Sequence, residues 1–279
     1  MNVLSIQSGV VYGHVGNSAA QFCLQRLGHA AWRIDTVRFS NHPGHGGLAG
    51  ETTAAAEIAR LVEALDARGW LAGCAALLSG YLGAADQGAA LADAARRVKA
   101  ANSGALWLLD PVIGDHGRVF VKPGIPEFMR DVAAPEADIL TPNGFELGWL
   151  TGMPVDGIES AKAAAARLRG DGRRIVVATG LPEPGGGIAT LCLHAGGAHV
   201  VTTPRVDIAV NGTGDSFAAI FLARLLATGD LRAALAHAAS AVHALLVRTR
   251  AAGARELLLI DGQDDLVAPA PRFPAQRVA

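Results

Sequence analysis

The chain has 279 residues, of which 51% are hydrophobic, so it is long enough for one large α/β domain, or at most two small ones, with a buried core. Its 24 Lys and Arg residues nearly balance 25 Asp and Glu residues, which excludes a basic field that would gather nucleic acid or an anionic membrane. We therefore expect a small-molecule partner, with no nucleic acid and no membrane.

The N-terminus lacks the basic and apolar segments of a signal peptide, and no apolar run reaches ~18 residues without a charge or a glycine. These features predict a cytoplasmic protein. Three cysteines, Cys23, Cys74 and Cys192, are an odd number at wide spacing, which favours neither a disulfide framework nor a zinc site. We expect them to be buried or incidental thiols.

Strands and helices are predicted to alternate along most of the chain, which is typical of a parallel sheet covered by helices. The predicted strands are 3–8 (broken by Gly9), 31–37, 74–78, 105–109, 138–140 and 174–178, and the helices 17–27, 53–68, 86–101, 143–150 and 160–169. Next come a hairpin of strands 188–193 and 199–202, a helix ending near residue 227, a helix at 231–247 and a last strand at 256–260. We predict one domain over 1–260 and an irregular tail over 261–279.

A glycine-rich motif, Asn211-Gly212-Thr213-Gly214-Asp215-Ser216-Phe217, leads into the helix that ends near residue 227. Its glycines can turn several backbone N–H groups toward one point, where the helix dipole attracts an anion. Asp215 beside such a point is a candidate base for phosphoryl transfer to a hydroxyl, and the dipole should keep it ionised near neutral pH. The alternative is an ordinary helix start, with Thr213 or Asp215 as the N-cap.

Polar residues at four further places are candidates for a ligand or metal site. Ser8 ends the first strand, where it is a ligand contact or a turn residue. Asp110 directly follows the strand at 105–109, and we expect it either to hold Mg2+ or to cap a turn. Glu146 lies three residues after Asn143, a spacing typical of a capping box that is also compatible with ordering metal-bound water. His42 and His45 lie in a glycine-rich loop and are ligands, bases or backbone-bonded side chains.

Several segments together carry a family resemblance, in order from about residue 3 to residue 250. The most selective are Ser5-Ile6-Gln7-Ser8 and Phe39-Ser40-Asn41-His42. The others are Gly13-His14-Val15-Gly16-Asn17, Leu78-Ser79-Gly80-Tyr81-Leu82-Gly83, Asp110-Pro111-Val112 and Gly212-Thr213-Gly214-Asp215, with Val37. Together these segments resemble the pyridoxal kinases of the ribokinase-like superfamily. The resemblance implies a three-layer αβα sandwich with a mostly parallel central sheet.

The resemblance also implies ATP-dependent phosphorylation of the 5′-hydroxymethyl group of pyridoxal, and of pyridoxine and pyridoxamine in some members. By analogy Asp215 is the catalytic base, and Asp110 and Glu146 act through Mg2+. The substrate would contact Ser8, Val15, Val37, Pro43, Gly44, Tyr81 and Asp215. ATP would contact Asp110, Thr141, Glu146, Thr179, Thr203, Pro204, Arg205, Val206, Gly212, Thr213 and Gly214. Family members also respond to K+ and are generally homodimers.

Two departures from the family pattern bear on the substrate. Pro43 stands where a threonine usually touches it, which removes a hydroxyl and a backbone N–H. Gly9 replaces a common histidine, which should leave more room above the ring. Two alternatives therefore stay open: a hydroxymethylpyrimidine kinase of the same superfamily, and a non-catalytic protein that binds pyridoxal phosphate.

Overall fold

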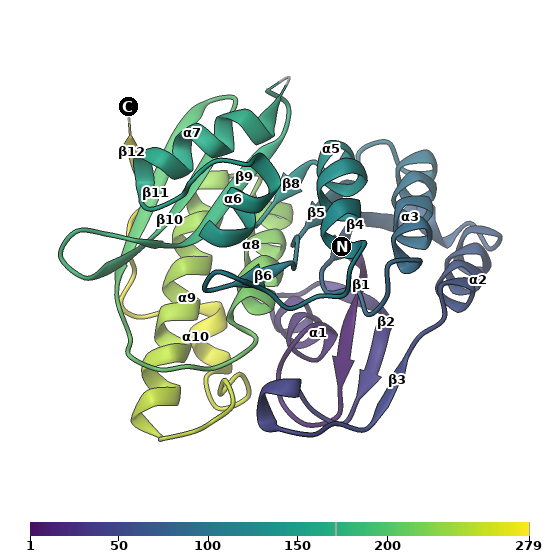
Figure 1. Ribbon diagram of the computed structural model, residues 1–279, viewed down its shortest axis with the longest axis horizontal. Helices are drawn as coiled ribbons and strands as arrows, with labels where there is room; N and C mark the ends of the chain where they lie inside the picture. Colours follow the sequence, from purple (N-terminus) through teal and green to yellow (C-terminus); the bar gives the residue numbers. More distant parts are fainter. Residues whose placement is uncertain (171, 279) are drawn as a thin grey trace.

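The computed structural model describes residues 1–170 and 172–278, which build a ten-stranded sheet (Figure 1). Its strand order is β12-β11-β10-β9-β8-β5-β4-β1-β2-β3. The strands are β1 Asn2–Val10, β2 Ala30–Phe39, β3 Gly50–Thr52, β4 Cys74–Ser79, β5 Leu106–Leu109, β8 Ile139–Leu140, β9 Ile175–Pro182, β10 Gly187–His194, β11 Gly197–Pro204 and β12 Gln276–Val278. A separate small hairpin joins β6 Gly114–Asp115 to β7 Arg118–Val119.

The six strands β2, β1, β4, β5, β8 and β9 are neighbours and run parallel. Strands β10, β11 and β12 continue the sheet antiparallel to one another, and β3 pairs antiparallel with β2. Two reversals bring β11 back to the direction of β9. Hence β11 and the six parallel strands all end at one edge of the sheet, called here the carboxyl edge.

Helices cover both faces of the sheet, which confirms the predicted three-layer αβα sandwich (Figure 1). One face packs against α2 Ala55–Asp66, α3 Gln87–Ala101, α4 Ile125–Phe128, α5 Ala134–Glu136, α6 Gly144–Thr151 and α7 Ile158–Arg169. The other packs against α1 Asn17–Arg26, α8 Thr213–Thr228, α9 Leu231–Ala251 and α10 Gln263–Val267. Helix α8 contacts both α1 and α9, and its residues 216–223 are all buried, which explains its nearly uniform apolar sequence.

The end of the chain departs from the predictions. The segment 256–260 is not a strand: Leu257 and Leu259 are buried in the helical layer of α1, α8 and α9, so their alternation reflects burial without sheet pairing. The predicted irregular tail contains α10 and β12, and β12 pairs with β11 from residue 276 to residue 278. Ala279 lies outside the described residues. Backbone pairing at an open sheet edge carries almost no signal in the sequence, which is why the tail was missed.

Two other predictions can be compared directly. Strand β1 does not break at Gly9 but continues to Val10, with an irregularity in its pairing to β2 between Gln7 and Gly9. The three cysteines are free and buried, as predicted, and burial raises the pKa of the Cys23 thiol to about 12.

Within the described part of the chain, no helix is long and apolar enough to cross a bilayer.

Candidate active site

The carboxyl edge gathers most of the residues singled out in the sequence. Ser8 and Val37 lie near the ends of β1 and β2, and Tyr81 follows β4. Asp110 and Thr141 immediately follow β5 and β8. On the other side of β8, Thr179 lies in β9, and Thr203 and Pro204 end β11, with Arg205 and Val206 in the loop beyond. The parallel topology thus brings segments more than 190 residues apart to one edge.

The N-terminus of α8 begins at a glycine, as expected of an anion-binding turn, and anion binding there stays a prediction. Its N-cap is Gly212, at φ 86°, and no side chain caps the helix, so the alternative with Thr213 or Asp215 as N-cap is wrong. A Cβ at Gly212 would stand 1.8 Å from the carbonyl oxygen of His14, so this position requires glycine for space as well as for backbone conformation. The first-turn N–H groups are therefore left without a side-chain partner and suit an anion.

Asp215 lies one residue beyond Gly214, in the first turn of α8. Burial raises the pKa of its carboxyl, and the backbone amide of Gly16 opposes that shift by favouring the charged form. The rise differs from the expectation based on the helix dipole alone, because desolvation has the larger effect. Gly16 also touches Ser8: a Cβ at Gly16 would stand 2.2 Å from the Ser8 Oγ. Ser8, in β1, and Asp215, in α8, therefore both contact the same short loop, 13–16.

Asp110 and Glu146 form a buried acidic pair. Asp110 Oδ1 accepts a hydrogen bond from Thr141 Oγ1 at 3.2 Å, so the side chain does not cap a turn. Burial, followed by the negative charges of Glu146 and Asp215, raises the pKa of Asp110. Burial also raises the pKa of Glu146, while backbone amides, first that of Ile113, oppose the shift. Within residues 1–170 and 172–278, no Lys, Arg or His side chain lowers the pKa of these three carboxylates.

Glu146 has a clear structural role, as its spacing from Asn143 predicted. Its backbone N–H donates to Asn143 Oδ1, and its Oε2 accepts the N–H of Asn143, both at 2.9 Å. The second oxygen, Oε1, accepts the N–H of Ile113 at 3.0 Å. Asn143 Nδ2 also donates to the Gly114 carbonyl at 2.9 Å. The capping box therefore fixes the base of the β6–β7 hairpin next to Asp110.

These carboxylates fit a Mg2+ ion bound together with nucleotide phosphates. Magnesium in such sites takes one or two protein carboxylates and completes its shell with phosphates and water. No group of three or more His, Cys, Asp or Glu side chains within residues 1–170 and 172–278 forms a complete metal cage. Asp110 has one oxygen without a protein donor and is suited to direct binding, whereas both oxygens of Glu146 already accept backbone N–H groups and suit a role through water.

The glycine-rich loop folds over the N-terminus of α8. Pro43–His45 forms a short 3-10 turn. Pro43 is its first residue, where a missing N–H costs no hydrogen bond. His42 Nδ1 accepts the N–H of Gly44 at 3.0 Å. Of the roles predicted for His42, the structure therefore shows the hydrogen bond to the backbone. A Cβ at Gly44 would stand 3.5 Å from the side-chain amide of Asn211. This contact brings Pro43 and Gly44 beside the anion-binding turn.

The apolar residues expected near the substrate are buried or partly buried. Val15 and Val37 are buried, and Tyr81 is partly buried. The Thr36 hydroxyl donates to the Tyr81 carbonyl at 2.7 Å. A Cβ at Gly83 would collide with Val37 at 2.3 Å, so the segment after β4 packs closely on the end of β2. The space above Gly9 is not open as predicted, because the Asp35 carboxyl lies 2.6 Å from where its Cβ would stand.

Among the residues expected to contact ATP, Thr141 and Thr179 are held by backbone hydrogen bonds. The N–H of Thr141 donates to Leu109 at 3.1 Å, and that of Thr179 donates to Pro142 at 2.9 Å. Thr203, Pro204, Arg205 and Val206 share the carboxyl edge with them through β11. Sequence reasoning missed Gly16 and Glu256. Gly16 lies within the segment Gly13-His14-Val15-Gly16-Asn17. No sequence pattern indicated a role for Glu256, because its partners are all distant in sequence.

Comparisons with known proteins agree on one family. A family model described as phosphomethylpyrimidine kinase matches residues 72–257. The chain is 47% identical to "Pyridoxal kinase PdxY" of Rubrobacter xylanophilus, over 100% of this chain and 98% of that protein. It is 46% identical to the protein of the same name from Granulibacter bethesdensis, over 99% of each. The solved pyridoxal kinase of Leishmania donovani in complex with ADP and pyridoxamine superposes with a TM-score of 0.93 at 29% identity, over 100% of this chain and 99% of that one.

Proposed function

This chain belongs to the pyridoxal kinase family, and from that membership we propose that it phosphorylates the 5′-hydroxymethyl group of pyridoxal with ATP. The products are pyridoxal 5′-phosphate and ADP. The single observation that carries the proposal is the arrangement of loop 13–16, where Gly16 touches both Ser8 and the candidate base Asp215 beside an uncapped helix N-terminus. A bound alcohol that reaches Asp215 there also reaches the phosphate-binding turn.

The transfer follows from the chemistry of these groups. The substrate alcohol oxygen attacks the γ-phosphorus of ATP, the bond from that phosphorus to the β-γ bridging oxygen breaks, and the alcohol proton passes to Asp215. The backbone N–H groups at Gly212, Thr213 and Gly214 stabilise the charge on the transferring group. Mg2+, when bound, neutralises charge on the nucleotide phosphates. Asp110 would hold it directly, and Glu146 would position its water and the hairpin base.

The substrate and nucleotide assignments are part of the proposal. Ser8 would hydrogen-bond the pyridine ring, and Val15, Val37 and Tyr81 would form the walls around it. Pro43 and Gly44 would close the ring site from the loop. Thr141, Thr179 and the run Thr203, Pro204, Arg205 and Val206 would line the nucleotide side. Pyridoxine and pyridoxamine are proposed as further substrates, since solved relatives from Leishmania donovani hold each of them with ADP.

The rival substrate is a hydroxymethylpyrimidine, as the description of the matching family model suggests. That match begins at residue 72, after the two most selective segments, whereas the pyridoxal kinase relatives match along the whole chain. An assay of ADP release with Mg-ATP and either pyridoxal or hydroxymethylpyrimidine separates the two. Turnover of pyridoxal supports the proposal. Turnover of the pyrimidine alone refutes it, and tight pyridoxal phosphate binding without ADP release supports the non-catalytic alternative.

Three expectations stay predictions: activation by K+ and a homodimer, which rest on the family resemblance, and a cytoplasmic location, which rests on the composition of the N-terminus and the apolar runs. Stimulation of turnover by K+ over Na+ tests the first, and the mass measured by light scattering tests the second. Fractionation of cells that express the chain tests the third.

A further inference from the structure

Glu256 lies in the irregular segment between α9 and α10, far in sequence from the loops it contacts. Its side chain is 14% exposed. One carboxylate oxygen, Oε2, accepts the backbone N–H of His14 at 3.1 Å. The other, Oε1, is hydrogen-bonded to Nε2 of His45. One carboxylate thus joins two loops that have no sequence proximity to it, and we call Glu256, His14 and His45 the Glu256 clamp.

Both joined loops build the acceptor side of the candidate active site. His14 belongs to loop 13–16, whose His14 carbonyl packs against Gly212 and whose Gly16 touches Ser8 and Asp215. His45 ends the 3-10 turn whose Gly44 lies beside Asn211. The clamp therefore acts on the two loops at the alcohol subsite. Through His14 it also borders Gly212 of the proposed phosphate-binding turn, but it contacts none of the strand ends proposed to bind the rest of the nucleotide.

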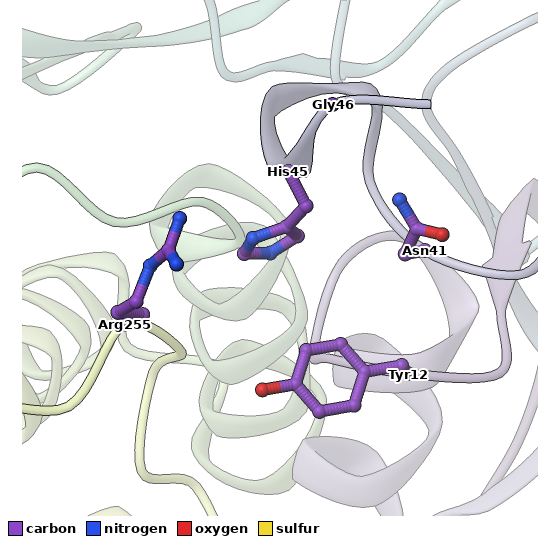
Figure 2. A pocket seen from close by; sticks show the side chains of 5 residues that line it. All are labelled: Tyr12, Asn41, His45, Gly46 and Arg255. Carbon is purple, nitrogen blue, oxygen red and sulfur yellow. The ribbon is translucent and has the colours of Figure 1, made fainter. Parts of the chain in front are cut away.

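The surroundings of the clamp fit a fixed carboxylate. A Cβ at Gly13, which has φ 97°, would stand 2.2 Å from Glu256 Oε2, so loop 13–16 approaches the carboxylate as closely as only glycine permits. The Tyr12 ring packs edge-to-face on His45, with centroids 5.8 Å apart and an interplanar angle of 76°. Tyr12 and His45 line a cavity of about 340 Å³ together with Asn41, Gly46 and Arg255. Figure 2 shows these five residues from close by.

We propose that Glu256 is a positioning residue that sets the geometry of the acceptor-alcohol subsite by holding loop 13–16 and the Pro43–His45 turn together. The inference rests on the proposed function, because it concerns the same reaction. Glu256 touches neither reacting group and acts through the loops. Its loss should therefore raise the KM for the alcohol much more than the KM for the nucleotide. A purely structural role would instead lower the amount of folded, active protein and leave both KM values unchanged or shift them alike.

The test compares E256A, H45A, the double variant and E256Q, with KM measured separately for pyridoxal and for ATP. We expect E256A to raise the KM for pyridoxal on the order of 10-fold, the usual effect of losing a charge-assisted hydrogen bond, with a much smaller change in the KM for ATP. H45A should raise the same KM, and the double variant should be no worse than E256A because the two residues act through one contact. E256Q should keep the KM for pyridoxal near the wild-type value. Its side-chain amide can still accept the N–H of His14 and donate to the His45 ring.

Asp265→Asn is the matched control. The Asp265 side chain is 18% exposed and pairs with Arg248 at 2.9 Å, in α10 next to the same C-terminal segment, but it contacts neither loop. It should leave both KM values unchanged. An unchanged KM for pyridoxal in E256A and H45A, an equal rise in both KM values, or the same effect from Asp265→Asn overturns the proposal. Wild-type protein that does not phosphorylate pyridoxal refutes the proposed function instead. If E256A does not fold, H45A, whose residue lies in a loop, decides the question.

Discussion

The free carboxylate oxygen of Asp110 points at Gly214: Oδ2 lies 3.8 Å from the position that a Cβ on Gly214 would occupy. An acidic group thus faces the turn whose N–H groups attract an anion. The two are compatible when a phosphate binds the turn and a cation lies between the phosphate and the carboxylate. Such an arrangement would account for Asp110 lying beside Glu146 and Asp215 with no neutralising cationic side chain among the described residues.

Replacing Asp110 by Asn should separate stability from activity. Its pKa is raised in the folded state, so the folded protein holds this proton more tightly than the unfolded chain does. Stability is therefore lost as pH rises from the unfolded pKa through the raised folded pKa. At neutral pH, without nucleotide or metal, D110N should melt at or above the wild-type temperature, while kcat/KM for Mg-ATP falls on the order of 10²-fold. A clear loss of thermal stability together with normal kcat/KM would contradict this account.

Asp215→Asn should bind both substrates and scarcely turn over. Without the base, kcat should fall on the order of 10²–10⁴-fold, whereas the Kd for ATP measured by calorimetry should stay near the wild-type value. Asp264→Asn provides the control, because Asp264 is an exposed carboxylate that pairs with Arg26 away from the carboxyl edge. Near-normal kcat in D215N would remove Asp215 from the role of base.

The acid limb of the pH profile should lie above the ordinary aspartate pKa of about 3.9. Burial raises the pKa of Asp215, and the residue accepts a proton only while ionised. Activity is therefore present above the raised pKa and is lost as pH falls through it. Initial rates at low pyridoxal concentration, measured as kcat/KM from about pH 4 to 9, test this. A limb at or below the ordinary value would mean that another group controls the acid side.

Gly212→Ala and Gly229→Ala form a matched pair at the two ends of α8. Both positions have positive φ, 86° and 67°, so an added methyl group strains each by about 1 kcal/mol. A Cβ at Gly212 collides with the His14 carbonyl at 1.8 Å, whereas one at Gly229 meets nothing within 4 Å. We expect G229A to lower thermal stability slightly with normal turnover, and G212A to lose turnover at least on the order of 10²-fold. Equal turnover in the two variants would show that the exact path of this helix start is unimportant.

The layered fold could be predicted from the sequence because it depends on local patterns. Short apolar runs separated by amphipathic helices specify parallel strands with helices on both faces, and the 188–202 hairpin followed from glycines between two strands. The errors lie where a pattern has two structural meanings. Alternation at Leu257 and Leu259 matches a strand but results from burial among helices, and the pairing of β12 with β11 depends on backbone groups rather than on side chains.

The sequence by itself determined the residues that can do chemistry here: a carboxylate in a glycine-rich helix start, and acids and hydroxyls at strand ends. Only the tertiary structure decided how they are held. Desolvation raises the pKa of Asp215 where the helix dipole alone predicted an ionised group, and backbone amides occupy both oxygens of Glu146. Glu256 joins two loops that precede it by more than 200 residues. Burial and long-range contacts depend on the packing of the whole chain, which no short segment encodes.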